Sequence, residues 1–343
     1  MAKTNPGRFF EDYSVGEAIH HAVPRTVSGG ERALYHALYP ARHALYSSDE
    51  FAKGCGLSAA PIDDWAAFHV VFGKTVPDIS LNALANLGYA EGRWLKPVWP
   101  GDTLRSTSDV IGVKQNSNGK SGVVWVRTKG VNQRDEVVLE YVRWAMVRKF
   151  DLDAPAPETV IPELKPVLEA SDLVVPEGLD FTGYDFTLAG EPHRWGDYEV
   201  GEVIDHVDGV TVEEAEHMMA TRLWQNTAKV HFDASLREDG KRLIYGGHVI
   251  SMARALSFNG LANAQMVVGL NGGAHANPCF SGDTVKAWSE VLDKAETAAP
   301  GVGALRLRLV ATKGGEPFRL RGDDGKYLPE VLLDLDYWAL VPL

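Results

Sequence analysis

The stretch Arg8-Phe9-Phe10-Glu11-Asp12-Tyr13-Ser14-Val15-Gly16-Glu17 has a counterpart far along the chain, His193-Arg194-Trp195-Gly196-Asp197-Tyr198-Glu199-Val200-Gly201-Glu202. The shared aspartates, Asp12 and Asp197, lie 185 positions apart, and the shared tyrosine, valine and glycine keep that spacing. The same spacing relates Thr26-Val27 to Thr211-Val212, and Leu38-Tyr39 to Leu223-Trp224. Self-similarity at a fixed spacing indicates a duplicated structural unit.

Two further anchors recur in the same order. Gly101-Asp102-Thr103 matches Gly282-Asp283-Thr284, and the run from Tyr141 to Val147 matches the run from Leu335 to Val341. We therefore predict two copies of one unit, residues 1–150 and 192–343. The intervening residues 151–191 are predicted to form an extended linker, because prolines that fix φ recur along them: Pro155, Pro157, Pro162, Pro166 and Pro176.

Each copy has the same predicted order of elements. A mixed helix comes first (Gly29–Leu38 and Glu213–Leu223), with Ser28 or Thr211 available as a cap. A charge-poor helix follows a polar loop, at Trp65–Val71 and Val249–Leu261, and its composition predicts deep burial. The β-rich runs come last: Thr103–Val113, Val123–Arg127, Val137–Val147, Thr284–Asp293, Ala304–Thr312 and Val331–Val341. This order predicts an α+β unit in which an antiparallel sheet wraps around a central helix.

Composition excludes several classes of protein. The chain has 343 residues, 45% of them hydrophobic, and a net charge of -12, which argues against a nucleic-acid surface. Two cysteines cannot build a disulfide framework, and no apolar run approaches the roughly 20 residues of a membrane span. The N-terminal residues also lack the pattern of a signal peptide. We expect a soluble, cytoplasmic protein with no nucleic-acid or membrane partner.

At this point the sequence resembles a known family. Two such units in one chain, with Gly-Asp-Thr and a closing aromatic strand in each, resemble the double hot-dog fold of MaoC-like enoyl-CoA hydratases. More narrowly, Gln225–Phe232 and Tyr245-Gly246-Gly247-His248 resemble the mesaconyl-CoA hydratase branch. The resemblance implies a CoA-thioester substrate, no cofactor, and reversible hydration of mesaconyl-CoA to β-methylmalyl-CoA.

The resemblance also implies catalytic residues. The family's R-specific hydratase motif, Gly-Asp-x-Asn-Pro-Leu/Ile-His, places its histidine on His231 and its aspartate on Asn226. An amide can orient a water but cannot accept its proton at neutral pH, so His231 would act as both base and acid. Asp233 is an alternative acid. A structural role for His231 beside a core helix is the competing interpretation.

A glycine pair precedes the second charge-poor helix. Gly246 and Gly247 would let backbone N–H groups approach the thioester and stabilise the enolate that hydration generates. Tyr245 and His248 flank the pair and either touch substrate or pack. A dicarboxylic substrate also needs a cation, for which Arg222, Arg254 and Arg42 stand nearest in sequence.

The first copy lacks these groups. Ala41, Tyr46 and Ser48 replace Asn226, His231 and Asp233, and either Ile62-Asp63 or Asp63-Asp64 replaces the glycines. We therefore predict one active site per chain, with the first copy shaping the acyl-CoA cleft.

Several alternatives remain at this stage. The histidine spacings match no metal-ligand pattern, and Gly269–Gly273 is interpreted as a strand end or bulge. A hydratase for another enoyl-CoA, a thioesterase and a non-catalytic acyl-CoA-binding module all remain open. So does the assembly, because fused copies could supply the usual pair internally or pair again as a homodimer.

Overall fold

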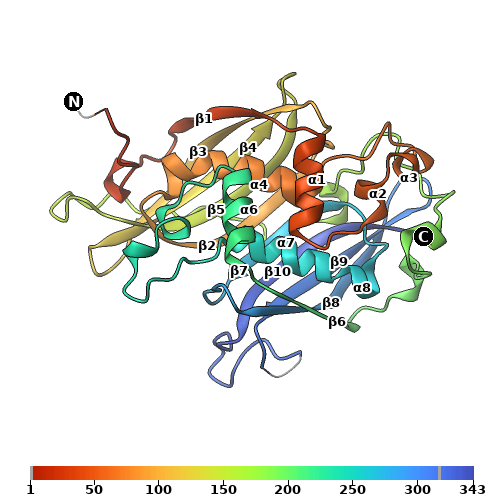
Figure 1. Cartoon of the computed structure of the whole chain (residues 1–343). Coiled ribbons are helices and arrows are strands. Elements are labelled where there is room, and N and C mark those ends of the chain that lie inside the picture. The colour runs from red at the N-terminus through yellow and green to blue at the C-terminus, as the bar shows by residue number, and fades with distance from the viewer. Residues whose placement is uncertain (1–2, 316–317) are drawn as a thin grey trace.

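The ten strands form one continuous antiparallel sheet. The computed structural model describes residues 3–315 and 318–343. The strand order is β1-β3-β4-β5-β2-β7-β10-β9-β8-β6, and the chain runs through both halves as Figure 1 shows. The strands are β1 (Ala18–Thr26), β2 (Ala83–Trp94), β3 (Thr103–Gln115), β4 (Ser121–Val131), β5 (Val137–Arg148), β6 (Val203–Thr211), β7 (Val267–His275), β8 (Thr284–Glu296), β9 (Val302–Thr312) and β10 (Val331–Pro342).

The strand order repeats from the two edges inward. From one edge it runs β1-β3-β4-β5-β2, and from the other it runs β6-β8-β9-β10-β7, so β2 and β7 meet in the middle. The helices repeat as well, with α1 (Gly29–Leu38) matched by α6 (Glu214–Leu223) and α4 (Asp64–Thr75) matched by α7 (Gly246–Leu256). This is the predicted tandem hot-dog arrangement, and the predicted α+β class is confirmed.

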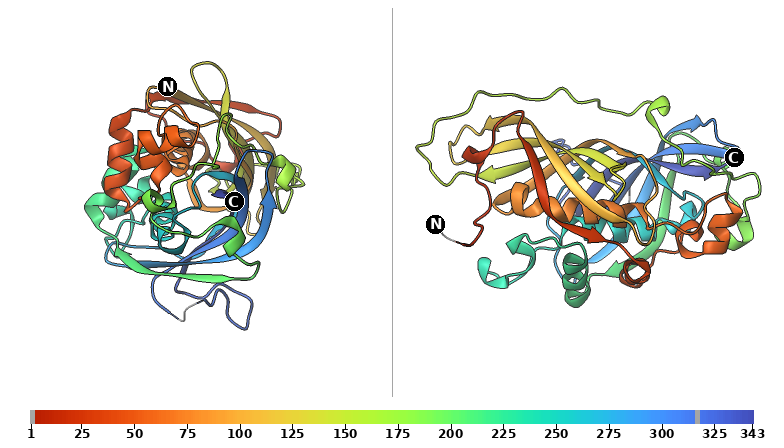
Figure 2. Two further views of the ribbon diagram at one scale, coloured as in Figure 1. Left: turned by 90° about the vertical axis from the view of Figure 1, so that its right-hand side faces the viewer. Right: turned by 90° about the horizontal axis from the view of Figure 1, so that it is seen from above.

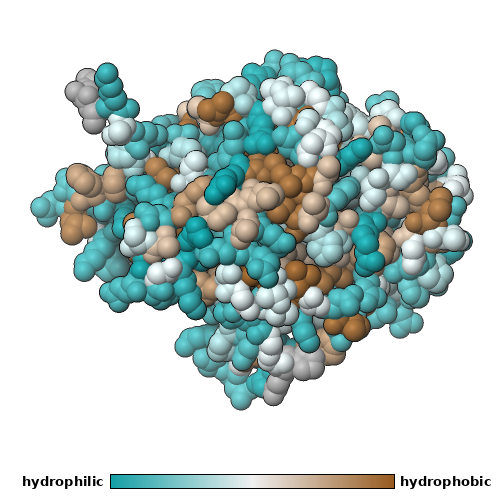
Figure 3. Space-filling model, in the orientation of Figure 1, coloured by the Kyte–Doolittle hydropathy of each residue, from teal (hydrophilic) through white to brown (hydrophobic). Residues whose placement is uncertain are grey.

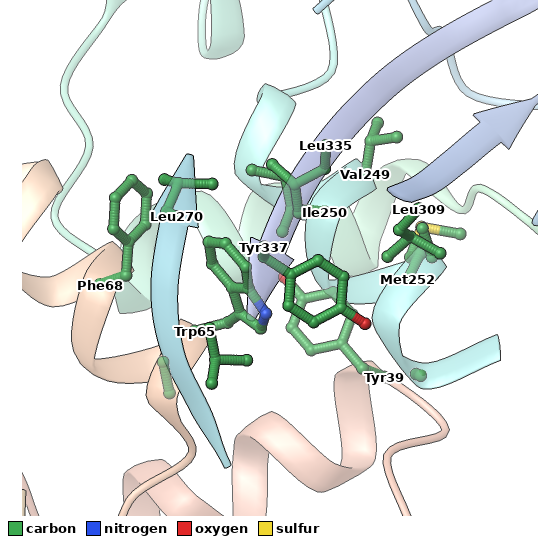
Figure 4. Packing of buried hydrophobic residues seen from close by; sticks show 14 of the residues in the cluster. Tyr39, Trp65, Phe68, Val249, Ile250, Met252, Leu270, Leu309, Leu335 and Tyr337 are labelled. Atoms are coloured by element: carbon green, nitrogen blue, oxygen red, sulfur yellow. The ribbon is translucent and has the colours of Figure 1, made fainter. Parts of the chain in front are cut away.

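The two central helices lie in the core and hold the halves together. All twelve residues of α4 are buried, and ten of α7, because neither helix has a charged face to turn toward solvent. Figure 4 shows Trp65 and Phe68 of α4 packed near Val249, Ile250 and Met252 of α7, with strand residues between them. One apolar core therefore crosses the boundary between the copies.

Several predicted elements differ from the structure. The second central helix begins at Gly246 rather than Val249, and it ends at Leu256 because Asn259 and Gly260 leave helical geometry in the short α8 (Phe258–Leu261). Ser28 caps α1 as predicted, whereas Thr211 ends β6 and Glu213 holds the N-cap of α6 without a side-chain bond. The strands β1, β2, β6 and β7 were not predicted.

The glycine-rich run Gly269–Gly273 lies within β7. The pairing of β7 with β10 skips Asn271, so the predicted bulge is present there, although the segment is not the end of the strand.

The segment between the copies forms an extended strap outside the sheet (Figure 2, right). Val160 pairs with Val113 of β3, the Lys165 N–H donates to Glu91 of β2, and the Leu168 N–H donates to Asn271 of β7. The strap therefore crosses the seam where β2 meets β7. The short helices α2 (Ala44–Ser47), α3 (Asp49–Gly54) and α5 (Phe186–Ala189) complete the fold. Within the described residues, no helix has the length and apolarity to cross a bilayer.

Candidate active site

A cavity of about 280 Å³ lies beside the seam and takes its walls from both halves. The second half contributes the predicted site loop and the start of α7. The first half contributes the end of α4, the π-helical turn that continues it (Val76–Ser80), and residues of β2 and β5. The polar or aromatic lining side chains are Phe72, Ser80, Asn86, Tyr89, Arg143, Asn226, His231, Tyr245, Asn277 and His275.

His231 is the base candidate in this cavity. It ends a short 3₁₀ turn, Lys229–His231, and its Nδ1 lies 2.7 Å from the Leu243 carbonyl oxygen. Because a carbonyl only accepts, Nδ1 carries the proton and Nε2 is left as the free lone pair. Burial lowers the pKa of His231 to about 4, and the hydrogen bond to Leu243 acts in the opposite direction. The imidazole is therefore neutral at physiological pH and able to accept a proton.

Asn226 lines the same cavity on a tight loop. Gln225 before it has φ of 54°, and the Asn226 Oδ1 accepts the Ala228 N–H at 3.0 Å, which fixes the orientation of the amide. The loop rests directly on α4, since a Cβ built on Gly73 would overlap the Trp224 carbonyl oxygen. A helix glycine in the first half thus permits the position of Asn226 in the second.

Gly246 is the first residue of α7 and lines the cavity. No described residue accepts a hydrogen bond from its N–H, which stands at the positive end of the helix dipole. A Cβ there would lie 2.6 Å from Nδ1 of His275, so any other residue would displace that ring or the start of the helix. Gly247 is not among the cavity-lining residues, and its Cα packs against the rings of Tyr245 and His69. Of the predicted pair, the geometry favours Gly246 as the oxyanion donor.

A layer of buried aromatic and imidazole rings packs against the residues that line the cavity. Tyr245 lines the cavity, and its hydroxyl lies 3.3 Å from Nδ1 of His69. His217 accepts the Tyr245 N–H at 3.0 Å, and its ring lies 6.0 Å from that of His231. His248 bonds Tyr39 at 3.0 Å and does not line the cavity. Of the two flanking residues predicted, Tyr245 can therefore reach substrate, and His248 packs.

The other predicted residues lie elsewhere. Asp233 is exposed and caps its own turn through Ser235. Arg222 is exposed and borders a separate shallow hollow between α1 and α6, where apolar side chains gather near the middle of the face in Figure 3. Arg254 is buried and bonded to His43, Ser257 and the Ala264 carbonyl, and Arg42 stacks on Phe258. Neither Arg254 nor Arg42 lines the cavity.

Among the cavity residues missed from the sequence are His275, Tyr89, Arg143 and Asn86. His275 ends β7, and its Nε2 lies 3.2 Å from the Tyr89 hydroxyl across the seam. Burial, and to a lesser extent the nearby His231, lowers the pKa of His275 to about 4. Arg143 offered a signal, because a cation replaces Tyr337 of the other copy on a strand whose alternate residues are otherwise apolar or aromatic. Among the described residues, no cluster of three or more metal-ligating side chains is present.

The corresponding position in the first half is filled by its own side chains. Ile62 donates to the Val98 carbonyl as Ile244 donates to Cys279, so Asp64-Trp65 is the true counterpart of Gly246-Gly247. This corrects both predicted alignments of the glycines. The Tyr46 hydroxyl donates to Oδ2 of Asp64, and the Trp94 indole donates to the Asp64 carbonyl. Burial raises the pKa of Asp64 to about 8.

Comparison with known proteins agrees with the fold. A crystal structure of a MaoC domain protein dehydratase from Chloroflexus aurantiacus superimposes with a TM-score of 0.97 at 57% identity, covering 100% of this chain and 99% of that one. A Mycobacterium tuberculosis protein with a double hot-dog fold gives 0.73 at 23% identity, covering 97% and 98%. The fold and cavity thus define a MaoC-like double hot-dog protein.

Sequence relatives show which family within the MaoC-like class this chain belongs to. The mesaconyl-CoA hydratase family model matches residues 1–317. The mesaconyl-CoA hydratase of Cereibacter sphaeroides is 80% identical over 341 residues, and the beta-methylmalyl-CoA dehydratase of Chloroflexus aurantiacus is 58% identical over 349, each match covering 99% of both chains. The chain belongs to the mesaconyl-CoA hydratase family.

Proposed function

We propose that this protein is a hydro-lyase that reversibly adds water to mesaconyl-CoA to give β-methylmalyl-CoA. The observation that carries the proposal is the neutral His231 in a cavity beside the Gly246 N–H, where neither its Nε2 nor that N–H has a partner among the described residues. The names of the two relatives support the substrate.

The residues divide the chemistry between them. The Asn226 amide and the Nε2 of His231 hold a water against the β-carbon, and Nε2 takes the proton as the water attacks. Electron density moves to the thioester oxygen, where the Gly246 N–H and the helix dipole stabilise it. The protonated His231 then returns a proton to the α-carbon. A negatively charged substrate nearby favours the protonated imidazole and raises its pKa above the value in the empty site.

The direct test is incubation of the purified protein with mesaconyl-CoA, following loss of the conjugated thioester and the mass of the product. Formation of β-methylmalyl-CoA without free thiol is expected. Release of free CoA would instead identify a thioesterase. Tight binding without exchange of solvent hydrogen into substrate would identify a binding module.

A panel of enoyl-CoA esters distinguishes a mesaconyl-CoA hydratase from a hydratase that acts on another enoyl-CoA. If a linear monocarboxylic ester is hydrated faster than mesaconyl-CoA, the dicarboxylic assignment is wrong. Pairing of two chains and a cytoplasmic location stay predictions of the sequence, and light scattering of the purified protein tests the first.

A further inference from the structure

Arg143 is a fully buried cation in the wall of the active-site cavity. It lies on β5 opposite Tyr89 of β2, with a relative exposure of 0%. Tyr337 holds the matching position on β10 in the other half, where it is equally buried. The cation is therefore specific to the half that faces His231.

In the part of the chain that the structure describes, this guanidinium forms no ion pair with an acidic side chain. Its Nη2 donates to Oγ1 of Thr75 at 2.7 Å, an Nη1 contact to Oγ of Ser80 measures 3.5 Å, and the Phe72 ring lies 4.3 Å away. The Nε is buried without a hydrogen-bond partner. Within the described residues, the hydrogen bonds of the guanidinium go to hydroxyl groups and not to a carboxylate. An arginine cannot lose its proton to relieve this, so the folded protein retains an uncompensated buried charge.

A second unsatisfied group lies beside it. Asn86 of β2 is opposite Ala145, two residues along β5 from Arg143, and it lines the same cavity. Both polar atoms of its side-chain amide are buried without a partner. Buried polar groups are nearly always hydrogen-bonded, so two such groups in one cavity wall point to a ligand with several acceptor oxygens.

We propose that Arg143, with Asn86 beside it, binds the free carboxylate of the substrate and so selects a dicarboxylic acyl group. This inference rests on the proposed function. In mesaconyl-CoA the free carboxylate is attached to the β-carbon, the atom that receives water. An ion pair there would hold that carbon beside His231 and would offset repulsion between the carboxylate and the developing enolate.

The other arginines do not fit this role. Arg254 already donates to His43, to Ser257 and to main-chain carbonyls, Arg42 stacks on Phe258, and Arg222 is exposed outside the cavity.

The test compares two esters of the same shape. Tiglyl-CoA is mesaconyl-CoA with a methyl group in place of the free carboxylate. The wild-type protein is expected to prefer mesaconyl-CoA. Arg143→Gln is expected to lower kcat/KM for mesaconyl-CoA by about 10²-fold or more, as for loss of one partner of a buried ion pair. The loss with tiglyl-CoA should be far smaller, so the preference collapses, and Arg143→Lys should fall between the two proteins.

The controls distinguish a failure of this inference from a failure of the proposed function. Arg222→Gln removes an exposed cation of the second half and should leave the preference unchanged. An equal loss on both esters in Arg143→Gln, with a lower thermal midpoint, would assign the arginine a structural role and overturn the inference. An unchanged preference would also overturn it while leaving the hydratase function intact. A wild-type protein inactive on mesaconyl-CoA would instead refute the proposed function, and this inference with it.

Discussion

The two halves of the chain have the same fold around two differently occupied sites. In the second half, His231, Gly246 and His275 border an open cavity. At the matching positions of the first half, Tyr46 and Trp94 both donate to Asp64, the hydroxyl to its carboxylate and the indole to its main-chain carbonyl. The difference shows that one fold can hold either a cavity or a set of hydrogen-bonded side chains at equivalent positions.

Exchange of the base should give the largest effect. His231→Gln keeps the polarity and approximate volume of the side chain but removes the proton acceptor. It should lower kcat/KM for hydration by about 10²–10⁴-fold. Tyr46→Phe, the matched change in the filled site, should leave the rate nearly unchanged. A similar loss in both variants would mean that the first half also takes part in the chemistry.

A methyl group at the helix start should have the next largest effect. Gly246→Ala retains the N–H but drives a Cβ into the His275 ring, which displaces the donor and should lower kcat by about 10²-fold. Asp64→Ala is the counterpart. This change leaves the buried Tyr46 hydroxyl and the Val267 N–H without their hydrogen-bond acceptor. We therefore expect the free energy of unfolding, measured in urea, to fall by about 1–3 kcal/mol, with activity retained.

The helix glycine under the Asn226 loop should have a smaller effect. Alanine usually stabilises a helix interior relative to glycine, by about 1 kcal/mol. Gly73→Ala should do the reverse, because the Trp224 carbonyl occupies the space, and a shifted loop should reduce kcat/KM by about tenfold. Ala255, at the matching position of α7, tolerates its methyl group in the core, so Ala255→Gly should lower stability without a comparable loss of activity. Wild-type activity in Gly73→Ala would show that the loop adapts.

The smallest expected effect is the pH dependence of stability, which depends on several buried histidines at once. Burial lowers the pKa values of His231, His248 and His275 to about 4 and of His217 to about 3. Unfolded histidine titrates near 6.5, so the unfolded chain binds more protons below that pH. The free energy of unfolding should therefore be highest above about pH 6.5 and should decrease as the pH falls toward 4. The measurement is the urea concentration at the midpoint of unfolding, which should decrease over the same range. A midpoint that stays constant between pH 7 and 5 would contradict these pKa directions.

The sequence predicted the parts of this molecule that depend on local pattern or on repetition. The duplication, α1, the two buried helices and the β4–β5 and β9–β10 hairpin strands all follow from periodicity and anchors. The strands β2 and β7 escaped because glycines and polar residues interrupt them where they cross the centre of the sheet, and their pairing joins residues far apart in the chain. The loop with His231 and Asn226 was found by resemblance.

The cavity wall was not found, because Arg143 and Asn86 come from the other copy. Proximity in sequence pointed to Arg222, Arg254 and Arg42, whereas the sheet brings Arg143 to the site across the seam. Arg143 reaches the cavity only because the two halves join into one continuous sheet.

The covalent joining of the halves has an evolutionary consequence. In a symmetric pair made from one short gene, every substitution occurs twice, so a guanidinium introduced on the fifth strand would be buried at two places, one of them without use. In the joined chain the two strands mutate separately, so Arg143 on β5 can correspond to an uncharged Tyr337 on β10. The linker strap over the seam is therefore more than a tether. Because it joins the copies, equivalent positions on the two closing strands are free to differ, as Arg143 and Tyr337 do.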